Sequence, residues 1–192
     1  MKNSALIGVA LVLAVATSAV RGQANGSVEA KAQTCAACHG PNGNATDPQY
    51  PKLAGQTARY IYLELKDFKE GRRHDPQMEP MAKDLTAEDM LALADHYSKQ
   101  KPTPTGFKAD GAKVSAGAKK ADEVLCTMCH SGGFSGQNEI PRVAGQHYLY
   151  IKKQLSAFKT RQRTNDAGNM TSVASTLSET DIENLAQYIA NL

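Results

Sequence analysis

Apolar side chains recur at helical spacing in two stretches of the chain that resemble each other. In both stretches they fall at positions i, i+4 and i+7: Ile61, Leu65 and Phe68, and then Ile151, Leu155 and Phe158. This spacing lines up three side chains along one face of an α-helix. It predicts helices over residues 57–69 and 147–159.

Further helical segments flank these two stretches. Short helices are predicted at 28–34 and 114–125, each leading into a cysteine. The last helix of each half carries a matching apolar stripe: Met90, Leu93, Ala94 and Tyr97, and then Ile182, Leu185, Ala186 and Ile189. Candidate N-caps with an aspartate three residues later precede these last helices: Thr86 with Asp89, and Ser178 with Asp181. No segment alternates convincingly at every second position, so the predicted fold class is all-α.

The matching stretches belong to an internal repeat. Cys-Ala-Ala-Cys-His at 35–39 returns as Cys-Thr-Met-Cys-His at 126–130. Pro-Lys-Leu-Ala-Gly-Gln at 51–56 returns as Pro-Arg-Val-Ala-Gly-Gln at 141–146. The offset between the copies drifts by only a residue or two, which is typical of a duplicated unit with small loop changes.

A segment with two prolines and two glycines separates the two copies. We therefore predict one lobe at 25–101, a linker at 102–111 and a second lobe at 112–192. Lobes of about 80 residues or fewer bury little apolar area and usually need a staple or a bound group. A bound group is therefore expected in each lobe.

The N-terminal segment has the features of a secretory signal peptide. Lys2 is followed by an uncharged apolar run and then by small residues up to Ala24. We expect cleavage there, which makes 1–24 the signal peptide, with cleavage after Ala19 as the alternative. An uncleaved membrane anchor stays open as a second interpretation, because residues 3–20 carry no charge. Either way, the folded part is expected outside the cytoplasm.

Composition and charge narrow the range of functions. A hydrophobic fraction of 41% and a charged fraction of 21% are typical of a soluble globular protein. The 22 basic and 19 acidic side chains leave a net charge of only +3. This excess is too small to indicate nucleic-acid binding.

The duplicated Cys-x-x-Cys-His motif carries the chemistry. In an exported chain, two such thiols can add to the vinyl groups of a haem as thioethers, and the histidine that follows becomes a ligand of the iron. The sequence therefore predicts two covalently bound haem c groups on four cysteines: Cys35, Cys38, Cys126 and Cys129. The corresponding iron ligands are His39 and His130. The alternatives are a pair of disulfides and a four-cysteine zinc site, but neither explains a histidine at the same place twice.

A methionine is the expected second axial ligand of each iron. A thioether sulfur favours Fe(II) and closes the site to exogenous ligands. In the second lobe only Met170 lies in the segment before the last helix. The first lobe offers Met78 and Met81; Met78 is preferred, because it lies seven residues before Leu85 as Met170 does before Leu177. Nearby prolines and Gly168 place both methionines in predicted loops.

The repeated proline segment suggests how each histidine is oriented. A ligating imidazole usually donates its second N–H to a carbonyl. Pro51 and Pro141 are the candidate acceptors, although a simple turn before a helix is also compatible with the segment. His74 and His147 are expected at the surface. Four arginines could pair with haem propionates: Arg59, Arg72, Arg142 and Arg163.

With these motifs in place, the chain resembles the cytochrome c4 family of dihaem cytochromes, each lobe being similar to a class I (His/Met) cytochrome c. The resemblance covers both haem motifs, both Pro-x-x-Ala-Gly-Gln segments and the region of Met78. It implies two tandem class I domains, axial pairs His39 with Met78 and His130 with Met170, and packing about a pseudo-twofold axis. It also implies a periplasmic protein, in some members membrane-associated. The loop Ser131-Gly132-Gly133 departs from the Gly-Pro-Asn-Gly of the first lobe.

The expected function is transfer of single electrons, without enzymatic activity. The expected partners are redox proteins, such as a terminal oxidase or an upstream dehydrogenase. Two alternatives stay open: the cytochrome subunit of an oxidoreductase complex, and a dihaem enzyme such as a peroxidase. The enzyme would need an open or unusually ligated haem, which the methionine in each lobe argues against.

Overall fold

The computed structural model describes residues 21–192. The signal peptide predicted at 1–24 lies outside the described residues, apart from 21–24, which begin the first helix. Within the described part of the chain, no helix combines the length and apolar character needed to cross a bilayer.

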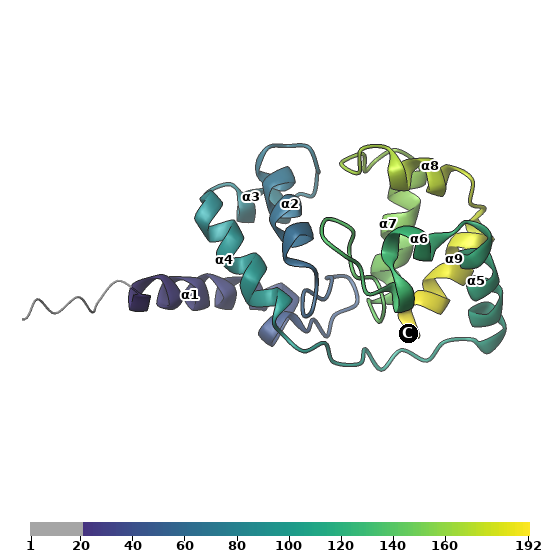
Figure 1. Ribbon diagram of the computed structural model, residues 1–192, viewed down its shortest axis with the longest axis horizontal. Coiled ribbons are helices and arrows are strands. Elements are labelled where there is room, and N and C mark those ends of the chain that lie inside the picture. The colour runs from purple at the N-terminus through teal and green to yellow at the C-terminus, as the bar shows by residue number, and fades with distance from the viewer. Residues whose placement is uncertain (1–20) are drawn as a thin grey trace, which may run out of the picture.

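The first lobe is built from four helices and a 3-10 turn. They are α1 (Arg21–His39), η1 (Pro41–Gly43), α2 (Ala58–Lys69), α3 (Met78–Ala82) and α4 (Ala87–Ser98). Figure 1 shows α4 beside α2 and the end of α1. Their shared core consists of five buried side chains: Ala32, Ile61, Leu93, Ala94 and Tyr97. The apolar stripes of the second and last helices of this lobe therefore meet as their spacing predicted.

The second lobe repeats the arrangement. It contains α5 (Gly111–Glu123), α6 (Cys126–His130), η2 (Gly132–Phe134), α7 (Tyr148–Lys159), α8 (Asn169–Ser175) and α9 (Glu179–Ala190). Helix α9 lies between α5 and α7, and its stripe fills a core with Ile151, Leu155 and Phe134. No strand occurs in residues 21–192, which confirms the all-α prediction.

The two lobes enter their haem motifs differently. In the first lobe α1 is longer than predicted and continues through the motif to His39. In the second lobe α5 ends at Glu123, and Leu125 adopts a left-handed conformation (φ 58°) before α6 begins. The helix predicted over 114–125 therefore stops earlier, because a left-handed residue cannot continue a right-handed helix.

Side-chain caps begin the helices where the sequence placed them. Thr86 and Ser178 each form a complete capping box with the aspartate three residues later. Thr57 caps α2 by accepting a hydrogen bond from the Tyr60 N–H. Each cap satisfies an N–H group that has no partner within its own helix.

Helices α5 and α9 cross at a very short distance. A Cβ atom at Gly117 would lie 2.1 Å from the backbone oxygen of Asn184. No side chain fits there, so the glycine is required by the close approach of the two helices.

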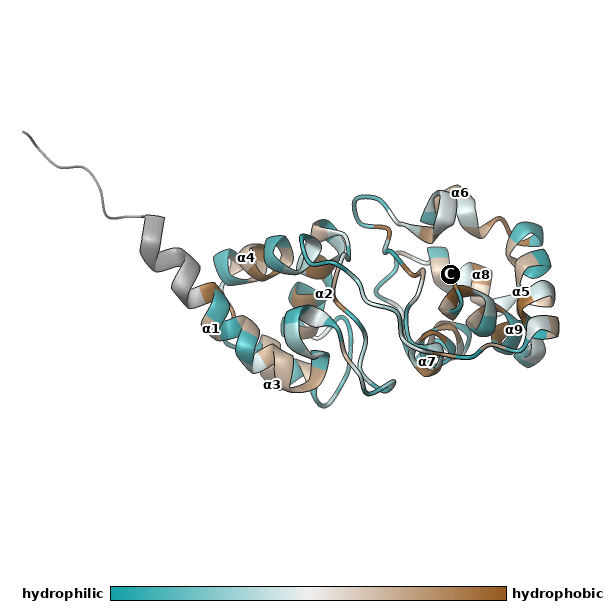
Figure 2. Cartoon of the chain, turned by 90° about the horizontal axis from the view of Figure 1, so that it is seen from below, coloured by the Kyte–Doolittle hydropathy of each residue, from teal (hydrophilic) through white to brown (hydrophobic). Residues whose placement is uncertain are grey.

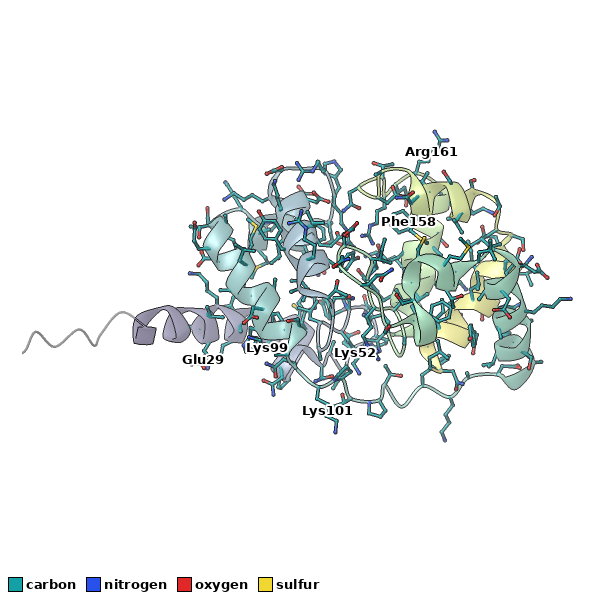
Figure 3. All side chains as sticks on the ribbon, viewed as in Figure 1. Glu29, Lys52, Lys99, Lys101, Phe158 and Arg161 are labelled. Carbon is teal, nitrogen blue, oxygen red and sulfur yellow. The ribbon has the colours of Figure 1, made fainter. Side chains whose placement is uncertain are left out.

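The linker runs along one side of the molecule between α4 and α5, as Figures 1 and 2 show. It is fixed to the first lobe, since Asn44 Oδ1 accepts the Thr103 N–H at 2.9 Å and Lys52 Nζ donates to the Thr103 carbonyl. At its other end the Asp110 N–H donates to Gln187 Oε1 of α9 at 3.1 Å. In Figure 3, Lys52 is seen between the two lobes, above Lys101.

A buried polar cluster joins the lobes. The Glu64 carboxylate of α2 accepts a hydrogen bond from Arg73 at 2.5 Å and another from Arg163 of the opposite lobe. The side chains of Glu64, Arg73 and Arg163 are only 12%, 9% and 8% exposed. Both guanidiniums donate further hydrogen bonds. Arg73 donates to Tyr150 and Gln154 of the second lobe. Arg163 donates to Tyr60 of the first lobe and to Gln154 of its own lobe. Each arginine thus bonds to the tyrosine of the other lobe, as a pseudo-twofold arrangement requires.

Candidate haem sites

Each lobe presents its two cysteines and its histidine on one short helical segment. In α1 and in α6 the cysteines are three residues apart, so both thiols project from neighbouring turns on the same side of the helix. The first cysteine of each pair, Cys35 or Cys126, is half-buried, whereas Cys38 and Cys129 are exposed. The two sites therefore offer their thiols in the same pattern.

The thiols of the two motifs share the same surroundings. Burial raises the pKa of Cys35 and of Cys126, whereas a thiol-exchange motif would need a lowered pKa. Within residues 21–192 the structure shows no disulfide between the cysteines and no group of three or more histidine, cysteine or acidic side chains gathered around a common point.

The histidine of each motif is held by the proline carbonyl that the sequence suggested. His39 Nδ1 donates to the Pro51 carbonyl at 2.8 Å, and His130 Nδ1 donates to the Pro141 carbonyl at 2.9 Å. Both hydrogen bonds are confirmed predictions. The proton on Nδ1 leaves the lone pair on Nε2, the nitrogen that would bind an iron.

Burial keeps these imidazoles neutral. His39 is 6% and His130 is 9% exposed. Burial lowers the pKa of both histidines, although the bond to the proline carbonyl acts in the opposite direction. A neutral imidazole is the form that binds a metal.

The two candidate methionine ligands were predicted in loops, and this part of the prediction is wrong. Met78 is the first residue of α3, and Met170 is the second residue of α8. These helices have only five and seven residues, too few for a helical period to show in the sequence. Pro80 is compatible with α3, because proline fits the first turn of a helix.

The two methionines are alike in burial, but only Met170 packs against the core of its lobe. Both are half-buried, whereas Met81 is 46% exposed. Met170 packs against the core of the second lobe, as do Cys126 and Val143. This lobe thus brings together one motif cysteine, the predicted sulfur ligand and an apolar residue of the repeated proline segment. In the first lobe the corresponding core gathers Cys35 and Leu53.

The loop after each motif has the same shape in spite of its different sequence. Gly40 (φ 72°, ψ 166°) and Ser131 (φ 64°, ψ 169°) share a conformation that is essentially limited to glycine. Phe134 (φ 57°) stands where the first lobe has Gly43. The Ser131 loop therefore keeps the shape of its counterpart, with backbone strain at two non-glycine residues.

One expectation for a polar residue is wrong. His147 is buried, not exposed, and its Nε2 bonds the Ala45 carbonyl of the other lobe at 2.9 Å. Sequence spacing does not show this partner, because it lies in the opposite lobe. Arg163 lies inside the interface, where its guanidinium bonds Glu64 of the first lobe and Gln154 of its own lobe; its pairing with a haem propionate stays a prediction.

Four polar residues at the interface were not predicted as functional from the sequence: Gln56, Glu64, Arg73 and Gln146. The repetition of Gln56 as Gln146 was visible in the duplicated segment. The equivalence of Arg73 with Arg163, at the same offset as Tyr60 with Tyr150, was visible too. Neither repetition by itself indicated that these side chains face the other lobe.

Thiol pairs, neutral histidines with a free Nε2 and half-buried thioethers form a donor set that suits haem. The fold and the sites thus define a c-type cytochrome with one haem site in each of its two lobes.

Comparison with known proteins identifies the family. The cytochrome c family model matches residues 23–100 and again 114–192. Cytochrome c4 of Azotobacter vinelandii is 36% identical over 209 residues, with 99% of each chain covered. The thiosulfate dehydrogenase electron acceptor of Thiomonas intermedia is 36% identical over 171 residues, covering 83% of this chain and 79% of the relative.

Among solved structures, reduced recombinant cytochrome c4 from Pseudomonas stutzeri superposes with a TM-score of 0.81 at 35% identity. The match covers 87% of this chain and 97% of that one. The chain belongs to the dihaem cytochrome c4 family. It consists of two tandem class I cytochrome c domains and binds two covalent haem c groups, and it is an electron carrier that works with redox protein partners.

Proposed function

We propose that the protein carries single electrons between respiratory redox partners in the periplasm, with no catalytic activity of its own. The observation that carries this proposal is the pair of buried, neutral histidines, each fixed by a proline carbonyl. Such a rigid histidine suits an iron that only changes its oxidation state, because little rearrangement accompanies electron transfer.

The residues of each lobe have separate roles in this proposal. Cys35 with Cys38, and Cys126 with Cys129, form the thioether bonds that hold the haems. His39 and Met78 would bind the iron in the first lobe, and His130 and Met170 would bind it in the second. The bound haem supplies an iron that cycles between Fe(II) and Fe(III).

A side-chain hydrogen bond and a buried alanine fix each of the short helices that carry Met78 and Met170. Asp75 Oδ1 accepts the Met78 N–H at 3.2 Å and so fixes the start of α3. Asp166 Oδ2 accepts the Thr171 N–H at 2.6 Å and fixes the start of α8 in the same way. Ala82 and Ala174, which are 0% exposed, anchor these two helices in the protein. We propose that these contacts hold each thioether sulfur in place.

The methionine assignment is tested by NMR of the reduced holoprotein. The methyl group of an axial methionine lies over the haem ring, so its resonance moves far upfield. Two such methyl resonances are expected. Met78→Leu and Met170→Leu should each remove one of them, and the matched control Met81→Leu should leave both. Loss of a resonance in Met81→Leu, with both retained in Met78→Leu, would transfer the first-lobe assignment to Met81.

The partners and the compartment are proposals with their own support. The N-terminal segment favours export, with membrane association if it is retained as an anchor. The likeness to a thiosulfate dehydrogenase electron acceptor favours an upstream dehydrogenase as donor, and a terminal oxidase is the proposed acceptor. Cell fractionation with N-terminal sequencing tests the compartment. Stopped-flow reduction by a purified dehydrogenase, followed by oxidation with oxidase-containing membranes, tests the two partners.

A further inference from the structure

A hydrogen-bonded chain connects each proximal histidine to the opposite lobe. The Pro51 carbonyl, which accepts the proton of His39, belongs to the peptide unit between Pro51 and Lys52. The N–H of that same peptide unit, on Lys52, donates to Gln146 Oε1 of the second lobe at 2.9 Å. The hydrogen bonds thus connect His39 to Gln146 through a single peptide group.

The second lobe has the equivalent series of hydrogen bonds, which leads from His130 to a glutamine of the first lobe. The Pro141 carbonyl accepts from His130, and the N–H of the same peptide unit, on Arg142, donates to Gln56 Oε1 of the first lobe at 2.7 Å. Each lobe therefore contributes one glutamine, which accepts a hydrogen bond from the peptide group that holds the histidine of the other lobe.

Both glutamines are fixed in place. Gln56 is 7% and Gln146 is 8% exposed. Each amide makes a second bond to the other lobe, from Gln146 Nε2 to the Lys52 carbonyl at 2.9 Å and from Gln56 Nε2 to the Arg142 carbonyl at 2.8 Å. Each Oε1 also accepts the backbone N–H of the residue that follows it in sequence, at 2.9–3.0 Å. These amides have no freedom to rotate without leaving buried groups unpaired.

Polarisation transmits the effect of the glutamine to the histidine. A peptide whose N–H donates a hydrogen bond carries more negative charge on its oxygen, so that oxygen becomes a stronger acceptor. A stronger bond to Nδ1–H makes the imidazole a better electron donor to a metal on Nε2. A better donor stabilises Fe(III) and lowers the reduction potential.

We propose that Gln146 and Gln56 are positioning residues that tune the haem of the opposite lobe. Gln146 acts on the haem of His39, and Gln56 acts on the haem of His130. The inference rests on the proposed ligation by these histidines. It makes each potential depend on the packing of the two lobes against each other.

The test compares Gln146→Leu with its pseudosymmetric counterpart Gln56→Leu in the holoprotein. The two reduction potentials are followed by NMR during a redox titration. The haems are distinguished through the residues between their cysteines, Ala36 and Ala37 or Thr127 and Met128, which differ between the two motifs. Gln146→Leu should raise the potential of the first-lobe haem more than that of its own lobe, and Gln56→Leu should show the opposite pattern.

A second readout does not depend on the potential. With ¹⁵N-labelled histidine, Gln146→Leu should move the Nδ1–H resonance of His39 upfield and leave that of His130 in place. The variant Gln146→Glu keeps an acceptor for the Lys52 N–H and adds a negative charge, but it loses the donor to the Lys52 carbonyl; it should lower the first-lobe potential, opposite to Gln146→Leu. If Gln146→Leu does not fold, Gln56→Leu gives the same comparison for the second-lobe haem.

The outcomes separate the inference from the proposed function. Equal shifts of both haems, a larger shift in the mutated lobe, or no shift in any variant would overturn the inference while both haems remain low-spin. A high-spin haem in the unmodified protein would instead show that the ligand assignment itself is wrong.

Discussion

Replacing Glu64 by glutamine tests the buried cluster that joins the lobes. The substitution keeps the shape of the side chain and removes its charge. Arg73 and Arg163 would then lie in the interface without the carboxylate that both contact. Gln154 already supplies an amide oxygen to both arginines, so a second amide at position 64 cannot replace the lost charge.

The expected cost follows from the burial of the pair. Removing one partner of a buried ion pair costs about 3–5 kcal/mol. The glutamine oxygen still accepts one hydrogen bond, so the lower end is expected, about 3 kcal/mol, which corresponds to a fall in Tm of roughly 6–12 °C for a protein of this size. Because the cluster lies between the lobes, the unfolding transition should also broaden or split into two.

The stability that Glu64 contributes depends on pH. Burial by itself raises the pKa of Glu64, but the guanidiniums of Arg73 and Arg163 outweigh it and bring the pKa below its ordinary value. A lowered folded-state pKa contributes stability above the unfolded carboxyl pKa, and this stability is lost as the pH falls through the folded value. The difference between wild type and Glu64→Gln should therefore be constant near neutral pH and shrink below about pH 4.

Calorimetry and urea unfolding of the holoprotein measure both effects. The control is Asp95→Asn, which removes an exposed ion pair with Lys99 whose side chains are 61% and 70% exposed. This control should cost no more than about 0.5 kcal/mol. A single sharp transition in Glu64→Gln, with a loss no larger than that of the control, would show that the Glu64 charge does not hold the two lobes together.

Two further predictions concern backbone positions. Gly117→Ala should destabilise the second lobe by about 2 kcal/mol or more, because its Cβ would meet the Asn184 carbonyl of α9. The control Gly111→Ala, whose Cβ would have nothing within 4 Å, should be neutral or stabilising. Equal urea midpoints for the two variants would contradict the close helix crossing. Ser131→Gly should stabilise the protein by about 1–3 kcal/mol by relieving a conformation that favours glycine, and the reciprocal Gly40→Ser should destabilise it, since a Cβ there would lie 2.3 Å from the Asn44 carbonyl oxygen; urea midpoints that move in the same direction would show that Ser131 is not strained.

Local sequence signals predicted the features that depend on nearby residues. The capping boxes at Thr86 and Ser178 and the apolar stripes of α2, α4, α7 and α9 involve residues within a turn or two of each other. The histidine bonds to Pro51 and Pro141 span a longer loop. They were still predictable, because a ligating imidazole requires such an acceptor and the proline segment occurs twice.

The contacts between the lobes were not predictable in this way. Glu64 meets Arg163, and Gln56 meets Arg142, from segments that no periodicity connects. Burial of His147 has the same origin, because its partner Ala45 lies in the other lobe. The duplication indicated which residues are equivalent, and the family resemblance implied packing about a pseudo-twofold axis. Which side chains form the contacts between the copies became visible only in the structure.

If both irons carry histidine and methionine ligands, neither haem has a position open for chemistry. Absorption and EPR spectra of the purified holoprotein, oxidised and reduced, with and without carbon monoxide, measure this. Two low-spin haems per chain, whose spectra do not change with carbon monoxide, are expected. A high-spin haem, or one that binds carbon monoxide, would show that Met78 or Met170 is not a ligand and would contradict the assignment of a pure electron carrier.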